Sequence, residues 1–232
     1  MTQSLKQLSL LCALLFFYQY SNAFWLLGFS DANTLSPGSL GVIAGTGAQF
    51  ARVGNPQSNS FTGAIPHAGI RYGLNEDTDI GYRLVQVALP FTSVGPTLGS
   101  EVDLKKRLTN VNDPYQIALV GGVAYSYLDI SGTSKSAYSP GADLILSHAI
   151  SPKYTWFTEL REVYTAIPTA VGSTGSNHFN ALGIASGGKI KLTDSTSFVP
   201  EIGYFHFNGL LNNQSANGNA IQIGAIFAIK IW

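Results

Sequence analysis

The sequence predicts an all-β protein: a single antiparallel up-and-down transmembrane β-barrel of about ten strands, behind a cleaved signal peptide. Three observations predict this fold. Apolar and polar residues alternate with a period of two along most of the chain. Short and long connections between the alternating segments follow each other in strict order. Charged residues make up only 11% of the 232 residues, against roughly 25% in a soluble domain.

The first 23 residues have the features of a secretory signal. A lysine precedes an apolar run over residues 8–18, and small residues close it at Ser21-Asn22-Ala23. We therefore expect cleavage after Ala23 and export across the inner membrane. An uncleaved anchor is the alternative, and the polar residues at 19–22 disfavour it. The only cysteine, Cys12, lies within the signal, so the mature chain is expected to hold no thiol and no disulfide.

The mature chain is expected to form one domain. A periplasmic N-terminal lead, residues 24–38, precedes an outer-membrane β-barrel, residues 39–232. No segment shows a helical period with caps. Each expected strand is near or above the ~9–11 residues that a tilted spanning strand needs. The strands are expected at about 40–53, 62–74, 79–90, 100–109, 115–128, 139–150, 154–164, 178–193, 197–207 and 219–232.

The connections give independent support. "NEDT", "TNVNDP", "SPK" and "TDST" are short and rich in turn residues, whereas the connections between them are longer. Outer-membrane barrels have short periplasmic turns and longer extracellular loops. With ten strands, both termini fall on the periplasmic side. The loops are rich in Gly, Ser, Asn and Thr and nearly uncharged, which suits solvent exposure or the binding of a host surface or a phage.

The distribution of charge indicates which face of the wall meets lipid. In "GIRYGLNEDTDIGYRL" (69–84), Ile, Tyr and Leu share one face, and Arg and Gly share the other. Arg or Lys facing the bilayer midplane would cost ~2–4 kcal/mol, so the charged face is expected to point inward. Only Arg52, Lys106 and Glu162 break this pattern, all near strand ends. The expected lumen charges are Arg71, Arg83, Glu101, Asp103, Lys105, Arg107, Asp143, Glu159, Arg161, Lys189, Lys191, Glu201 and Lys230.

The chain resembles the outer-membrane β-barrel proteins of Gram-negative bacteria. The resemblance is carried by the signal peptide, by "RYGLNEDTDIGYRL" and "VDLKKRL", and by the last strand, "AIQIGAIFAIKIW", which ends on an aromatic residue. It implies localisation in the outer membrane, contact with outer-membrane lipid and lipopolysaccharide, and insertion by the barrel-assembly machinery. Trp232 has the phase of Lys230 rather than of the apolar face, which departs from the usual assembly signal. The implied assembly signal comprises Phe227, Ile229, Ile231 and Trp232.

The leading functional hypothesis is a structural barrel or a narrow porin-like channel for small polar solutes. Eight strands are just filled by side chains, whereas sixteen or more leave an aqueous channel, and ten is nearer the filled end. The expected interior has eight basic and five acidic residues, which would give an open lumen a mild preference for anions. The main alternative is an adhesin or recognition protein that acts through its extracellular loops.

An outer-rim protease or lipid-modifying enzyme is a second alternative, because ten strands is also the size of the omptin proteases. Asp129, Glu162, His178 and His206 are candidate rim groups for general base catalysis. The sequence offers no tight acid pair and no serine at the spacing of an activated nucleophile. We therefore predict that the protein is not an enzyme and name no catalytic residue. The remaining histidines are expected to be ordinary wall residues.

No cofactor and no metal site are predicted. The mature chain has no cysteine cluster and no histidine pair at ligand spacing. "NEDTD" lacks the spacing, the glycine and the closing glutamate of a calcium loop. The formal net charge is zero and no basic surface is interleaved with aromatics, so nucleic acid is not an expected partner.

Overall fold

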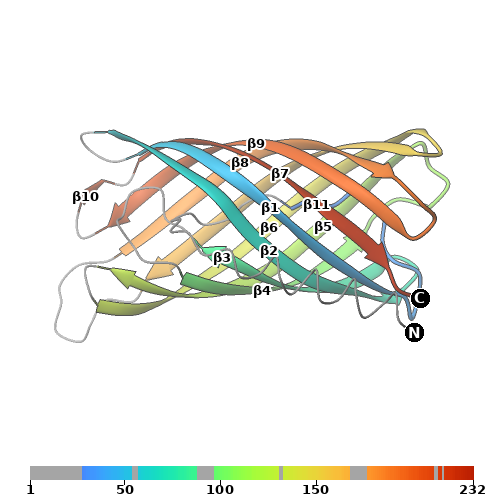
Figure 1. The fold of residues 1–232 in the computed structure, drawn as a ribbon, viewed down its shortest axis with the longest axis horizontal. Coiled ribbons are helices and arrows are strands. Elements are labelled where there is room, and N and C mark those ends of the chain that lie inside the picture. The colour runs from blue at the N-terminus through green and yellow to red at the C-terminus, as the bar shows by residue number, and fades with distance from the viewer. Residues whose placement is uncertain are drawn as a thin grey trace.

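The chain forms one closed antiparallel β-barrel (Figure 1). The structure is a computed structural model that describes residues 28–53, 57–87, 97–130, 133–167, 177–211, 214–215 and 217–232. Strands that follow each other in sequence are paired, and the sheet closes because β11 pairs with both β9 and β1. The predicted fold is confirmed. The predicted signal peptide, residues 1–23, lies outside the described residues.

Ten long strands make the wall, and each overlaps one of the ten predicted strands. A two-residue strand, β10 (Gln214–Ser215), pairs only with the end of β9. The part of the chain that the structure describes contains no helix long and apolar enough to cross a membrane. The long strands are β1 (Leu40–Val53), β2 (Ser58–Asn75), β3 (Thr78–Val87), β4 (Thr97–Arg107), β5 (Tyr115–Ile130), β6 (Thr133–Ser151), β7 (Tyr154–Ile167), β8 (Asn177–Lys191), β9 (Thr196–Leu211) and β11 (Gly218–Lys230).

The strands are strongly tilted against the barrel axis. Paired residues lead from Ala44 through β2, β3, β4 and β5 to Tyr138 on β6. In the other direction they lead through β11, β9, β8 and β7 to Ser151 on the same strand. The two paths start at the same residue but reach β6 at different residues, Tyr138 and Ser151. This offset along the strand corresponds to a strand tilt of about 40° against the barrel axis, within the range of closed barrels. Ten strands at this tilt enclose a narrow interior.

The two ends of the barrel differ. Four short connections lie at one end, which we call the turn end: residues 76–77, 108–114, 152–153 and 192–195. The start of β1 and the C-terminus lie at this end too, where the Leu40 N–H donates to the Trp232 carbonyl. The opposite end, which we call the loop end, carries the other connections, parts of which lie outside the described residues. By the topology of outer-membrane barrels, the turn end is the end expected to face the periplasm.

The outer side of the wall is apolar. Leu144 is 46% exposed, whereas Asp143 beside it on β6 is 2% exposed. The same contrast holds on β3, where Leu84 is exposed and Arg83 is buried. Such a continuous exposed apolar surface is suited to hydrocarbon rather than to water. The charged side chains are therefore enclosed by a wall whose apolar face is turned outward.

The interior contains apolar as well as charged side chains. Phe157, Phe179, Phe205 and Phe207 have no exposed surface. Three of these rings lie opposite a glycine on the neighbouring strand, since the register pairs Phe157 with Gly187, Phe205 with Gly183 and Phe179 with Gly209. A Cβ atom at Gly183 would lie 2.0 Å from the Phe205 ring. Interior glycines thus make room for rings that a ten-stranded barrel could not otherwise hold.

The polarity of the two faces changes near the loop end of β8 and β9, while the inward and outward alternation continues. Phe179 and Phe207 point inward, whereas His206 and Asn208 point outward and are exposed. The His206 Nδ1 atom lies 2.9 Å from the Asn219 Oδ1 atom on β11. Polar side chains therefore join apolar ones, such as the exposed Leu210, on the outer face toward this end.

We predict that Gly183→Ala destabilises the barrel, because the added methyl group must displace the Phe205 ring. Overpacking of this kind costs about 1–3 kcal/mol. Urea unfolding in lipid bilayers, followed by heat-modifiable migration on a gel, measures the difference. Gly121→Ala is the matched control, since a Cβ atom there meets nothing within 4 Å. Equal stability of the two variants would contradict the proposed role of Gly183.

Candidate functional site: the charged lumen

An arginine held between two carboxylates organises the lumen near the turn end. Arg71 on β2 forms ion pairs with Asp79 on β3 and with Asp103 on β4. The register places Gly81 between Arg71 and Asp103. A Cβ atom at Gly81 would lie 2.5 Å from the Arg71 guanidinium, so the missing side chain lets the arginine reach across β3. Asp79 is fully buried, and its charge is compensated by this contact.

The ionic network continues on both sides of Arg71. Arg83 Nη2 lies 2.7 Å from Glu101 Oε1, again between β3 and β4. Lys105 Nζ lies 3.7 Å from the second oxygen of Asp79. The three strands therefore share two neighbouring groups of paired charges: the pair of Arg83 with Glu101, and a connected set of Asp103, Arg71, Asp79 and Lys105.

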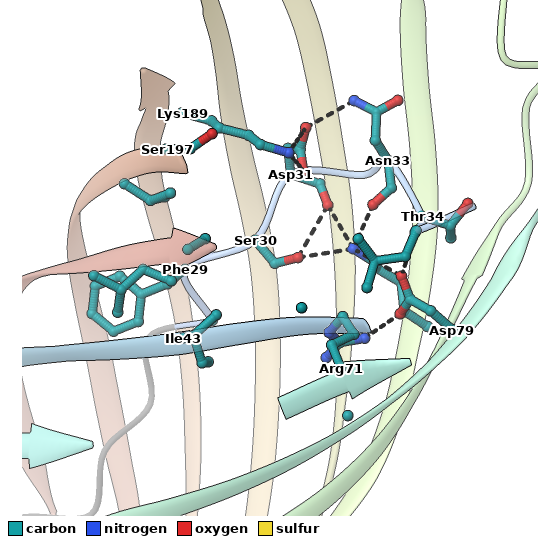
Figure 2. A pocket seen from close by; sticks show the side chains of 18 of the residues that line it. Phe29, Ser30, Asp31, Asn33, Thr34, Ile43, Arg71, Asp79, Lys189 and Ser197 are labelled. Atoms are coloured by element: carbon teal, nitrogen blue, oxygen red, sulfur yellow. Dashed lines mark hydrogen bonds and ion pairs between the residues drawn. The ribbon is translucent and has the colours of Figure 1, made fainter. Parts of the chain in front are cut away.

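The described part of the lead, residues 28–38, enters the turn-end half of the barrel: residues 28–35 lie inside it (Figure 2), and residues 36–38 are exposed at its end. Lys105 Nζ donates to the Asn33 carbonyl at 2.6 Å, to the Ser30 hydroxyl at 2.9 Å and to the Asp31 carbonyl at 3.1 Å. These three contacts use the three donors of an ammonium group. Lys105 is 2% exposed. It therefore joins the lead to the network on β3 and β4.

Asp31 attaches the lead to the opposite wall. Its carboxylate lies 3.2 Å from Lys189 Nζ on β8 and accepts a hydrogen bond from the Asn33 amide at 2.8 Å. Burial by itself raises the pKa of Asp31, but Lys189 and Lys105 outweigh that effect and hold the pKa below its ordinary value. Asp31 is therefore ionised at neutral pH, and its charge favours the inserted position of the lead.

The lead is also held by its backbone. The Leu35 N–H donates to Asp79 Oδ2 at 3.0 Å. Gly38 and Gly73 lie side by side, and the Gly38 N–H donates to the Gly73 carbonyl at 2.9 Å. Gly38 has a φ of 76°, which favours glycine. A Cβ atom at Gly73 would lie 2.1 Å from the Ser36 carbonyl oxygen, so glycine permits this close approach.

Two carboxyl groups accept hydrogen bonds from the inner end of the lead. The N–H of residue 28 donates to Glu159 Oε1 at 3.1 Å and to Glu201 Oε1 at 3.2 Å, and the N–H of residue 29 donates to Glu201 Oε2. Arg161 Nη2 lies 3.5 Å from Asp143 Oδ2 beside them. All four side chains are at least nine-tenths buried. This layer joins β6, β7 and β9 to the lead and crosses the middle of the lumen.

Aromatic rings lie next to this polar layer. The Phe29 ring stacks on His67 with 4.9 Å between ring centroids. Toward the loop end, the centroids of the Phe179 and Phe207 rings lie 6.2 Å apart, with 59° between the ring planes. The lumen therefore changes from ionic at the turn end to phenylalanine rings and uncharged polar pairs toward the loop end, where Gln222 donates to Gln49.

Most of the predicted lumen charges lie inside the barrel. Arg107 donates to the Glu76 carbonyl at 2.8 Å in the turn-end wall. Lys191 and Lys230 are exposed at the turn end and line a cavity described below. The assembly-signal residues are all exposed at the end of β11 or beyond it: Phe227, Ile229, Ile231 and Trp232.

The described candidates for rim catalysis do not converge. Glu162 on the outer face accepts a hydrogen bond from the Asn180 amide at 2.9 Å, and the His178 ring stacks on Tyr164. His206 is bonded to an asparagine instead of an acid. The side chain of Asp129 lies outside the described residues. Within the described ranges, no group of three or more His, Cys, Asp or Glu side chains is placed to hold a metal ion.

Sequence reasoning missed two features of the lumen. It expected a periplasmic lead, and it did not anticipate that residues 28–35 lie inside the barrel. The clustered polar residues of "SDANT" (30–34) were the available signal, since a solvated tether needs no such cluster. It also missed the inward phenylalanines. "HFN" at 178–180 and "FHFN" at 205–208 place a polar residue on the face that is apolar elsewhere.

No protein-family model and no curated protein matches the chain. Solved outer-membrane barrels do. The outer-membrane protease OmpT from Escherichia coli has a TM-score of 0.52 and 13% identity, covering 87% of this chain and 100% of that chain. An outer-membrane channel from Pseudomonas putida F1 has a TM-score of 0.46 and 9% identity, and the match covers 88% of this chain and 100% of that chain. Neisserial surface protein A has a TM-score of 0.40 and 13% identity, and the match covers 83% of this chain and 97% of that chain.

The likeness to OmpT, at 13% identity, concerns the fold alone, which is that of a Gram-negative outer-membrane barrel. Together with the apolar outer wall, it supports the expected localisation in the outer membrane. The named proteins differ in activity, so a shared fold assigns none of their activities to this chain.

We predict that acid releases the lead. Because the pKa of Asp31 is depressed in the folded state, its stabilising contribution is present above its unfolded pKa, about 3.9, and is lost as the pH falls through the folded value. Ala32→Cys in a Cys12→Ser background places one thiol at a fully buried position. A dithiodipyridine reagent, which reacts in acid, should modify it only below about pH 4.

Asp31→Asn in the same background is the matched control. The lead should then be released at neutral pH, and the dependence of the reaction on pH should largely disappear. A thiol equally protected in both proteins at pH 7 would show that Asp31 does not hold the lead.

Proposed function

We propose that this protein is a closed structural barrel of the outer membrane that does not conduct ions in its resting form. The observation that carries the proposal is that three successive layers cross the lumen. The lead and its lysine contacts lie in the turn-end half beside a cavity that opens at the turn end, the layer of Asp143, Glu159, Arg161 and Glu201 crosses the middle, and phenylalanine rings lie toward the loop end.

The charges support a structural role for the interior. Arg71 and Arg83 each form ion pairs with lumen carboxylates. An ion-conducting pore needs charged groups that face water and exchange partners, whereas these groups are enclosed and bonded to protein. A buried charge that loses its partner is strongly destabilising, so the network also braces the wall. A narrow channel for small polar solutes would need the lead and the phenylalanine layer to move.

We predict that the purified protein is silent in planar bilayers. A variant that combines Lys105→Met with Phe205→Ala and Phe207→Ala removes the main contact of the lead and part of the apolar layer. It should produce discrete conductance steps that increase with salt concentration. Leu119→Ala on the outer face is the control and should stay silent, because Leu119 is 47% exposed and does not face the lumen.

The proposal fails if the unmodified barrel itself conducts in discrete, salt-dependent steps. If the combined variant folds, as heat-modifiable migration would show, and still conducts no ions, the lead and the phenylalanine rings are not what closes the lumen, and the layer of Asp143, Glu159, Arg161 and Glu201 closes it instead.

A further inference from the structure

A cavity of about 400 Å³ lies in the turn-end half of the barrel, between the lead and the wall. It reaches the exposed turn residues Lys153, Asp194 and Ser195, so it is open at the end expected to face the periplasm. Figure 2 shows Phe29 and Ile43 on one side of it, and Arg71 and Asp79 on the other. Its volume is within the range of small-molecule sites.

One wall of the cavity is apolar. Ile43 on β1, Val199 on β9, and Ile226 and Ala228 on β11 point inward and line it. These strands are neighbours, since Ile43 pairs with Ala228 and Ile226 pairs with Val199. An apolar patch of this kind inside a polar lumen offers contact area to the hydrocarbon part of a ligand.

The mouth of the cavity is basic. Lys153, Lys191 and Lys230 come from three separate elements around it. Lys191 pairs with the fully exposed Asp194 at 2.9 Å, whereas Lys153 and Lys230 form no ion pair with any residue that the structure describes. The deeper lining differs, because Arg71, Lys105 and Lys189 already contact carboxylates there. Uncompensated positive charge is therefore concentrated at the entrance.

We propose that this cavity binds an amphipathic organic anion, with its anionic group at the mouth lysines and its apolar chain along the wall of Ile43, Val199, Ile226 and Ala228. The class that fits is a carboxylate with a short to medium aliphatic chain. A cation with the same chain is disfavoured by the lysines, and a fully polar anion leaves the apolar wall uncovered. Binding from the periplasmic side does not require the barrel to conduct, so this inference does not rest on the proposed function.

The test uses the mature protein in nanodiscs of zwitterionic lipid, with 8,8,8-trifluorooctanoate as the probe and ¹⁹F line broadening as the readout. Empty nanodiscs measure partition of the probe into lipid. We expect saturable binding at one site per barrel in excess of that partition. Octanoate should compete with the probe, and octylammonium should not.

Two variants address the two parts of the site. Ala228→Trp fills the cavity beside the apolar wall and should abolish binding. Lys153→Glu combined with Lys230→Glu reverses the charge at the mouth and should weaken binding at least tenfold. The matched controls are Ala142→Trp and Lys106→Glu, which lie on the outer face, and both should bind as the unmodified protein does.

Heat-modifiable migration establishes that each variant is folded. If Ala228→Trp does not fold, the binding measured for Lys153→Glu combined with Lys230→Glu tests the proposal without it. The proposal is wrong if binding does not saturate above that of empty nanodiscs, if octylammonium competes as well as octanoate, or if the folded cavity and mouth variants bind like the controls.

Discussion

The structure depends on compensating charges inside a wall that is apolar on its outer side. Hydrocarbon disfavours ionised side chains on the outer face of the strands, so most charged residues of the ten strands are concentrated in a narrow interior. There they must find partners, because a buried charge without one is strongly unfavourable. Arg71 meets this requirement with two carboxylates. Lys105 meets it with Asp79 and with oxygen atoms of the lead.

The lead therefore belongs to the barrel interior rather than to the solvent. It supplies acceptors for Lys105, a carboxylate for Lys189 and backbone donors for Glu159 and Glu201. The wall alone would leave these groups with fewer partners. Glycines serve the same crowded interior, since Gly81 gives space to an arginine and Gly183 gives space to a ring. Side chains, glycines and the lead together fill a lumen that ten strands leave only slightly open.

The fold could be predicted from the sequence because strand alternation and connection length are local patterns. The inward phase of Arg83 or Asp143 followed from the same period. The path of the lead could not be predicted, because its contacts join residues far apart in sequence, such as Gly28 and Glu201. Strand ends were also hard to locate. β6 begins at Thr133 rather than near 139, since polar residues that lack alternation still pair with β5.

Near the loop end of β9 the outward side chains become mainly polar, as His206 and Asn208 show. A strand of 16 residues extends about 50 Å along its own axis and about 40 Å along a barrel axis inclined by 40°, whereas the apolar band of such barrels is about 25 Å tall. His206 and Asn208 then stand at or above the lipid phosphates. The wall at β9 is therefore longer than the apolar band, so part of this strand must stand outside the hydrocarbon.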